Sequence, residues 1–321
     1  MKIGMVTDSV AHMDTDAMLD YCAELGIDAI EFCVGNWGAA AHIGDVNTLL
    51  EDSARQRELA AKIRDRGLEI SAFTANGNQL HPTDGERQST VVHNAIRLAE
   101  IFEVPRIVLM SGLPAGAPGD SMPNWVTTAW PPETHDILRY QWEDVAIPYW
   151  RKLVDYAEGR GVNQLCIEAH GAQLVHNMPS FMRLRDAVGP TVGLNFDPSH
   201  FIWMGGDPIE MIRRYADCIY HVHAKDTYID QHNLAEATRL DTRPMDRVLD
   251  RSWSYVTLGY GQPEDWWREF CWQLQARGYS EGVLSIEHED QNLSCNEGVR
   301  RSVDLLRRVM PQEQPDYQLP D

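Results

Sequence analysis

Short apolar runs alternate with amphipathic stretches along the whole chain. The runs predict eight buried strands, at residues 3–7, 28–32, 68–74, 106–110, 166–168, 193–197, 219–223 and 283–287. The stretches that follow the strands have helical spacing and predict helices at residues 14–25, 49–66, 89–102, 149–160, 180–188, 209–215, 265–277 and 296–309. Regular alternation of strand and helix requires a parallel sheet, and eight such units close into a barrel. We therefore predict an α/β fold, a (β/α)8 TIM barrel.

An open, doubly wound sheet is the alternative architecture. It is disfavoured because no Gly-x-Gly-x-x-Gly motif follows the first strand and the sequence contains no Walker-type phosphate loop. The chain has 321 residues, and no linker rich in glycine, proline or serine divides them into two cores. We therefore expect one barrel domain, residues 1–310, followed by a polar tail at residues 311–321.

Two connections are too long for simple turns. Residues 111–147 follow the fourth strand, and residues 226–264 follow the seventh. Long loops in compact domains usually serve function, and both lie on the strand C-terminal side, where barrel enzymes build their sites. The first connection carries Trp125, Trp130 and Trp142, which are costly to leave exposed. We favour a substrate lid or a subunit contact over a decorative surface insertion.

Charge and cysteine content limit the possible partners and compartments. The net charge of −20 argues against binding to nucleic acid or to an anionic membrane, both of which require a basic surface. The six cysteines form no Cys-x-x-Cys pair, which predicts reduced thiols and a cytoplasmic protein. The N-terminus leads directly into a strand without a signal-peptide pattern, and no apolar run is long enough to span a bilayer.

Four potential metal ligands end the last four predicted strands. They are Glu168, Asp197, His223 and Glu287. A salt bridge or a helix N-cap explains any one of them alone, but parallel neighbouring strands would bring all four to one rim. Carboxylate oxygen and imidazole nitrogen suit Mn²⁺, our first choice, as well as Mg²⁺, Co²⁺ or Zn²⁺. The quartet therefore predicts a divalent metal site with open positions.

A metal site of this kind suits chemistry beside a carbonyl group. Two adjacent oxygens of a sugar or hydroxyketone could occupy the open positions, and the metal would stabilise the enediolate that forms on proton removal. Glu168 and Glu287 lie on strands five and eight, so they could flank a substrate from two sides as base and acid. We therefore predict a metal-dependent enzyme.

Several segments resemble the sugar phosphate isomerase/epimerase group of the xylose-isomerase-like TIM barrels. They are Ile167-Glu168, Asp197-Pro198-Ser199-His200, His221-Val222-His223-Ala224-Lys225-Asp226, Leu258-Gly259-Tyr260-Gly261 and Ile286-Glu287. The likeness extends over nearly the whole chain, with the clearest motifs in its second half. It implies a divalent metal on the quartet and proton transfers by the two glutamates, but it does not specify a substrate.

Other polar residues are further candidates for the site. His200 matches a family histidine near metal and substrate, although it could instead cap the following helix. Lys225 could meet a substrate oxygen or developing oxyanion, or simply pair with Asp226 or a neighbour. His221 shares a strand face with His223 and is a candidate for a supporting or a purely structural role. His135, in the long tryptophan-bearing loop, is a candidate for an additional base. Trp37 could stack on a sugar ring, with core packing as the alternative.

The substrate and the end point of the reaction stay open. The first hypothesis is an isomerase or epimerase of a sugar or keto-sugar. The second is a lyase on a 3-oxo-sugar, as in inosose dehydratases or in the large subunits of C-glycoside deglycosidases, which the chain also resembles. Ile229 replaces an arginine of the ketose 3-epimerase branch, which disfavours a free-ketohexose epimerase. A non-catalytic sugar-binding or assembly subunit and a DNA-repair endonuclease are further alternatives, and the charge opposes the last. We expect a homo-oligomer or a complex with a small β-sandwich subunit.

Overall fold

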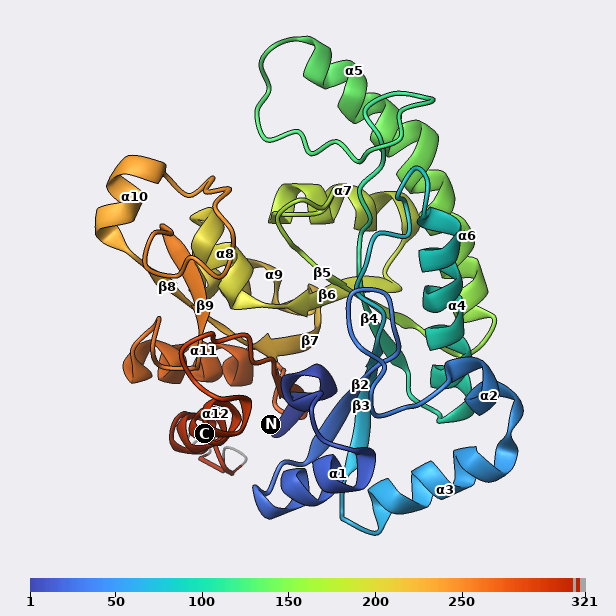
Figure 1. Cartoon of the computed structure of the whole chain (residues 1–321), viewed down its shortest axis with the longest axis vertical. Helices are drawn as coiled ribbons and strands as arrows, with labels where there is room; N and C mark the ends of the chain where they lie inside the picture. The colour runs from blue at the N-terminus through green and yellow to red at the C-terminus, as the bar shows by residue number, and fades with distance from the viewer. Residues whose placement is uncertain (314–315, 318–321) are drawn as a thin grey trace, which may run out of the picture.

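Eight parallel strands form a closed barrel in the computed structural model, which describes residues 1–313 and 316–317 (Figure 1). The strands are β1 (Lys2–Val6), β2 (Ala29–Cys33), β3 (Glu69–Thr74), β4 (Arg106–Met110), β5 (Gln164–Glu168), β6 (Val192–Phe196), β7 (Ile219–Ala224) and β10 (Val283–Ile286). Each pairs with its neighbour along the chain, and β10 pairs with β1 to complete the ring. The predicted TIM barrel is therefore confirmed.

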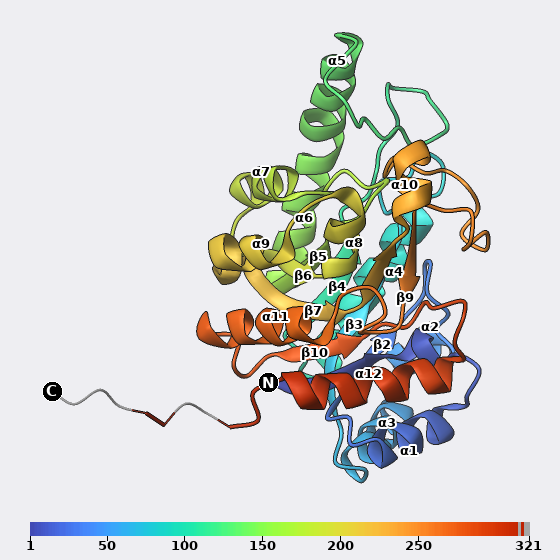
Figure 2. The same cartoon turned by 90° about the vertical axis from the view of Figure 1, so that its left-hand side faces the viewer.

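Helices cover the outside of the barrel. They are α1 (Thr15–Glu24), α2 (Val46–Glu51), α3 (Ser53–Arg64), α4 (Gly85–Ile101), α6 (Ile147–Glu158), α7 (Met178–Val188), α8 (Pro198–Met204), α9 (Pro208–Tyr215), α11 (Glu264–Ala276) and α12 (Cys295–Val309). Figure 2 shows α11 and α12 on the outside of β10. Among the described residues, no helix combines the length and apolar character that a membrane span requires.

The single helix predicted at residues 49–66 is wrong, because the chain breaks it at Asp52. The backbone of Asp52 is extended, with φ −106° and ψ 93°, and its carboxylate accepts hydrogen bonds from the backbone N–H groups of Ala54 and Arg55. Asp52 therefore ends α2 and caps α3 at the same position. An aspartate within a helical pattern is a capping signal that hydrophobic spacing alone does not register.

The two long connections contain regular structure of their own. Residues 111–147 include α5 (Glu133–Arg139) and a π-helix, η2 (Tyr140–Ala146), which continue without a break into α6. Figure 1 shows this arm standing above the barrel. Residues 226–264 include an antiparallel hairpin, β8 (Asp226–Ile229) with β9 (Trp253–Val256), and α10 (Gln231–Ala237) between its strands. The predicted polar tail, residues 311–321, lies partly outside the described residues.

A buried carboxylate anchors the hairpin to the barrel. The Asp226 oxygens accept hydrogen bonds from the backbone N–H groups of Thr227, Gly259, Gly261 and Gln262 and from the indole N–H of Trp267. Glycine is required at position 261, because a Cβ there would lie 2.2 Å from the Thr227 carbonyl oxygen. The Asp226 side chain therefore fixes the turn that leads from the hairpin into α11.

We predict that Asp226→Asn destabilises the fold. Both carboxylate oxygens of Asp226 accept hydrogen bonds from N–H groups. In the variant, the side-chain NH₂ group replaces one of these oxygens in either orientation, so the N–H groups that it faces lose their acceptor. The expected loss in free energy of unfolding is about 1–3 kcal/mol, measured by urea unfolding. Asp304→Asn, on the exposed face of α12, is the control and should stay within about 0.5 kcal/mol of the parent. Equal stability of both variants would contradict the anchoring role.

Candidate metal centre

The structure brings the four predicted ligands together at the C-terminal end of the barrel. Glu168 is the last residue of β5, Asp197 follows β6, His223 lies on β7 and Glu287 follows β10. One donor atom from each lies within 4.8 Å of the other three. The His223 Nδ1 atom is 3.2 Å from Glu168 Oε2 and 3.1 Å from Glu287 Oε2. The closed parallel register therefore turns four positions distant in the sequence into one cluster.

The chemistry of this cluster fits a divalent cation. Donors held at about 2.1 Å from one ion stand roughly 3 Å apart when they occupy adjacent octahedral positions, which matches the distances around the His223 Nδ1 atom. Burial opposes a positive charge on His223, but the carboxylates of Glu31 and Glu287 outweigh burial and raise its pKa well above the usual value. The carboxylates of Glu31, Glu168 and Glu287 thus attract positive charge at this point, as a metal site requires.

Glu31, which the sequence analysis missed, supports His223 from within the barrel. It lies on β2, is fully buried and accepts hydrogen bonds from the Nε2 atoms of His221 and His223 at 2.7 and 2.9 Å. The Thr74 hydroxyl also donates to it. Burial raises the pKa of Glu31, but the two imidazoles lower it by more, so Glu31 stays a carboxylate. With Nε2–H held by Glu31, the Nδ1 atom of His223 is the one presented to the cluster.

His200 binds two of the ligand carboxylates directly. Its Nε2 atom is 2.9 Å from Glu168 Oε1 and 3.2 Å from Asp197 Oδ2, and its Nδ1 atom is 2.9 Å from the Tyr255 hydroxyl. Burial lowers the pKa of His200, but the two carboxylates overcome it and raise the pKa to about 9. The N-cap of α8 is Asp197, which accepts from the Ser199 N–H, so His200 is not a helix cap.

Lys225 forms ion pairs with two glutamates and not with Asp226. Its ammonium nitrogen lies 3.1 Å from Glu287 Oε2 and 2.8 Å from Glu289 Oε2, and 4.3 Å from the centre of the Tyr255 ring. Burial opposes the charge, but these carboxylates raise the pKa of Lys225 well above the usual value. Of the two roles that the sequence left open, the structure shows the ion pair.

Two further groups hold Glu168, whereas one predicted residue lies elsewhere. The side-chain amides of Asn76 and Asn195 donate to Glu168 Oε2 at 3.1 and 3.0 Å. Neither asparagine, nor Tyr255, carried a sequence signal, because each follows or lies within an ordinary strand pattern. His135 is exposed on α5 and does not line the cavity at the cluster, so the structure does not bring it to the site.

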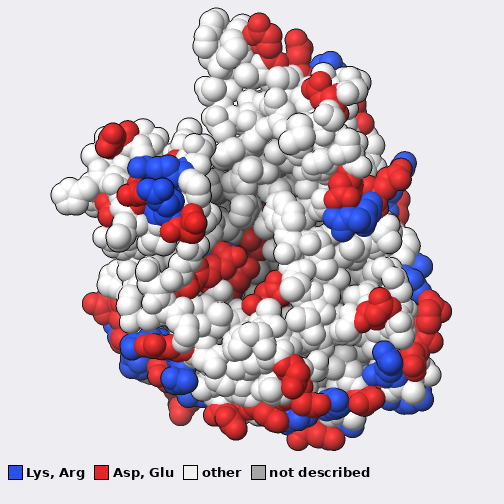
Figure 3. Space-filling model, viewed as in Figure 1, with Lys and Arg blue, Asp and Glu red and all other residues white. Residues whose placement is uncertain are grey.

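A cavity of about 140 Å³ opens onto the cluster. Glu168 and Glu287 form part of its wall, together with Asp8, Glu289 and Trp37. Figure 3 shows acidic side chains at the floor of a hollow in the centre of this face. Trp37 lines the cavity yet is 56% exposed, so its ring is available to a ligand and is not buried in the core.

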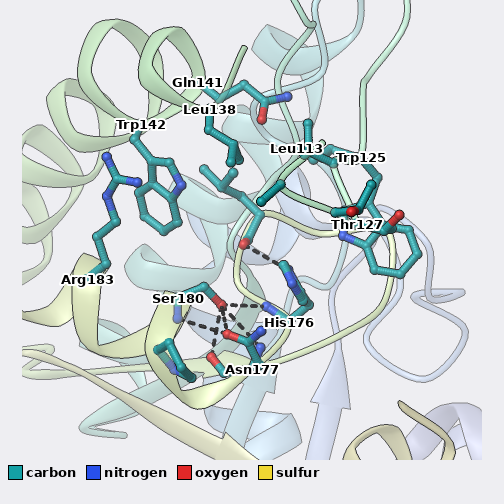
Figure 4. Close-up of a pocket in the computed structure, with 15 residues that line it drawn as sticks. Leu113, Trp125, Thr127, Leu138, Gln141, Trp142, His176, Asn177, Ser180 and Arg183 are labelled. Carbon is teal, nitrogen blue, oxygen red and sulfur yellow. Dashed lines mark hydrogen bonds between the residues drawn. The ribbon is translucent and has the colours of Figure 1, made fainter. Parts of the chain in front are cut away.

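A second, larger pocket of about 370 Å³ lies below the α5 arm and contains none of the four predicted ligands (Figure 4). Trp125, Trp142 and His176 line it, with Arg183 stacked over the Trp142 ring at 4.7 Å. The first long connection therefore buries Trp142 against the barrel and uses Trp125 as a pocket wall.

Comparison with known proteins places the chain in a family. A family model described as xylose isomerase-like TIM barrel matches residues 19–309, so the chain belongs to that family. A full-length relative is the uncharacterized protein YfiH of Bacillus subtilis (strain 168), 42% identical over 97% of this chain and 100% of that protein. A shorter match is 35% identical to inosose dehydratase of Geobacillus kaustophilus (strain HTA426), covering 25% of this chain and 26% of that protein.

Solved structures agree on the fold. The probable 3-DHS dehydratase AsbF from Bacillus anthracis superposes with a TM-score of 0.65 at 18% identity, covering 96% of this chain and 99% of that chain. The IOLI protein, solved with a binding zinc atom, superposes with a TM-score of 0.65 at 16% identity, covering 97% and 99%. Because the sequence identities are only 18% and 16%, these superpositions show that the barrel fold is shared and nothing more.

We predict that Glu31→Gln weakens metal binding. Glutamine offers one acceptor oxygen to two histidine N–H groups, so the His223 ring loses its fixed orientation. The expected fall in Mn²⁺ affinity is about 10–100-fold, measured by titration calorimetry on protein that circular dichroism shows to be folded. Glu24→Gln, on the exposed end of α1, is the charge-matched control. Unchanged affinity in folded Glu31→Gln protein would show that Glu31 does not orient the ligand.

Proposed function

We propose that this protein is a divalent-metal-dependent isomerase or epimerase of a sugar or keto-sugar. The observation that carries the proposal is the convergence of Glu168, Asp197, His223 and Glu287 at the C-terminal end of the barrel, where Glu168 and Glu287 line a cavity. Membership of the xylose isomerase-like family supports it, because the same end of a barrel holds the active site in such enzymes. These four residues would hold the metal, with Mn²⁺ as our first choice.

The residues around the cavity are arranged for proton transfer. Glu168 and Glu287 both line it, so each can reach a substrate carbon or oxygen from its own side. Burial raises the pKa of Glu168, but hydrogen bonds from His200 and His223 lower it well below the usual value, so Glu168 enters the reaction ionised and able to accept a proton. His200 and the two asparagines hold its oxygens in place.

Glu287 and Lys225 lie next to each other in the wall of the cavity. The ammonium of Lys225 donates to Glu287 Oε2, which fixes the carboxyl group and gives it a nearby positive charge. We assign the return of the proton to Glu287, and to Lys225 a contact with a substrate oxygen that gains negative charge. When bound, a divalent cation would polarise the carbonyl and stabilise the negative charge that proton removal creates.

A lyase is the second candidate. The partial match to inosose dehydratase and the structural likeness to a probable dehydratase favour it. The same first step, proton removal beside a carbonyl, would be followed by loss of water or of a larger group from the neighbouring carbon. Glu287 and Lys225 lie where they could protonate the leaving oxygen. A C-glycoside deglycosidase reaction belongs to this second candidate, except that the carbon–carbon bond to the aglycone would break and the proton would go to the departing aglycone carbon.

We also propose a partner and a location. The α5 arm and the β8–β9 hairpin would be the surfaces that contact a second copy or a small β-sandwich subunit. All six cysteines are free thiols, and five of them are buried, which supports a reducing, cytoplasmic location. The negative charge continues to argue against a nucleic-acid partner.

We predict that Glu168→Gln and Glu287→Gln each slow proton exchange by at least ~10²-fold, because each removes a general acid–base group. The measurement is solvent-deuterium incorporation into a panel of ketoses and keto-cyclitols, followed by NMR, with Mn²⁺-loaded protein. A chelator should abolish exchange, and Mn²⁺ or Co²⁺ should restore it. Glu24→Gln is the control. Near-normal exchange in both site variants would refute their assigned roles.

The end point of the reaction separates the two candidates. If the protein is an isomerase or epimerase, 2-keto-myo-inositol and the ketoses should gain deuterium without losing water, and a 3-oxo-C-glycoside should keep its aglycone. Mass spectrometry of the same incubations checks this. Loss of one water per molecule, or release of the aglycone, would replace the first candidate by the lyase.

A further inference from the structure

The cavity carries more negative charge than the four candidate metal ligands supply. Two carboxylates outside the quartet, Asp8 and Glu289, line the cavity with Glu168 and Glu287. Asp8 follows β1, and Glu289 lies two residues beyond Glu287, so both stand on the same rim as the quartet. Even with a divalent cation bound, the carboxylates would outnumber the positive charges of the cavity.

The described residues that line the cavity offer little positive charge to an anionic group. Among the described residues that line it, Lys225 is the one cationic side chain, and no arginine is present. Its ammonium already lies between Glu287 and Glu289 at 3.1 and 2.8 Å. A nearby backbone donor is also taken, because the Ala39 N–H is bonded to the Asp8 carboxylate. Sites for phosphate normally present a guanidinium, a free ammonium or a set of unpaired backbone N–H groups.

We propose that the substrate carries neither a phosphate nor a carboxylate, and that Asp8 and Glu289 are the residues that enforce this. The inference rests on the proposed function, since it names the substrate class of the same site. The ligand is an uncharged polyhydroxylated ketone the size of a single ring. A cavity of about 140 Å³ is of the order of a single sugar ring.

The same residues give this ligand suitable partners. Hydroxyl groups donate hydrogen bonds, and the carboxylates of Asp8 and Glu289 are acceptors at the cavity wall. The exposed ring of Trp37 offers an apolar face. Its centre lies 6.4 Å from the centre of the His170 ring, which also lines the cavity. An anionic analogue would meet like charge at contact distance, which acts as selection against it.

Paired ligands test this inference by equilibrium binding. Mn²⁺-loaded protein is titrated calorimetrically with D-fructose, D-tagatose and 2-keto-myo-inositol, and with D-fructose 6-phosphate, D-tagatose 6-phosphate and 5-keto-D-gluconate. We expect at least one uncharged compound to bind about 100-fold more tightly than each anionic compound, because like charges brought into contact cost several factors of ten. Glu289→Gln and Asp8→Asn should each narrow that preference by about tenfold, whereas Glu24→Gln should leave it unchanged.

The possible outcomes separate this inference from the proposed function. The inferred substrate class is wrong if a phosphorylated or carboxylated compound binds as tightly as the uncharged compounds or more tightly. It is also wrong if no uncharged compound of the panel binds. If the preference for uncharged ligands is unchanged in both Glu289→Gln and Asp8→Asn, these two residues do not cause it. If the uncharged compounds bind but gain no deuterium in the exchange experiment, the proposed reaction fails while the substrate class stands.

Discussion

The packing of several carboxylates into one buried space is the constraint on which this structure depends. Glu168, Asp197 and Glu287 place oxygens within 4.8 Å of one another, where like charges repel strongly unless positive groups or donors stand between them. The barrel supplies those groups from neighbouring strands. His223 inserts its Nδ1 atom between Glu168 and Glu287, and Lys225 pairs with Glu287 on the outer side. A cation is the natural completion of such an arrangement.

The support of the cluster reaches into the barrel and out to the hairpin. Glu31 holds His223 from below, in a position where a buried carboxylate is stable because two imidazoles and a hydroxyl donate to it. Tyr255, delivered by β9, bonds His200 from above and lies beside Lys225. The inserted hairpin is thus part of the site, and Asp226 connects its stability to the geometry of the cluster.

The two arms shape the surroundings of the site and leave its chemistry to the barrel. The α5 arm encloses a separate pocket, and the hairpin contributes Tyr255. The cavity wall itself comes from residues that end or follow the strands, which explains its small size and strong negative charge. Varying the arms while keeping these strand ends would change what lies beside the cavity and leave the carboxylate cluster in place.

The sequence by itself determined the barrel strands, their closure into a barrel and the four candidate ligand positions, because a buried strand and its polar end leave a local pattern that survives without neighbours. It could not reveal that Glu31 supports His223, since a glutamate in an apolar strand acquires its meaning only from β7 across the barrel. It also could not choose between the roles of His200 and Lys225. Those outcomes depend on which side chains the closed sheet and the inserted hairpin place within hydrogen-bonding distance, and that distance is a property of tertiary packing.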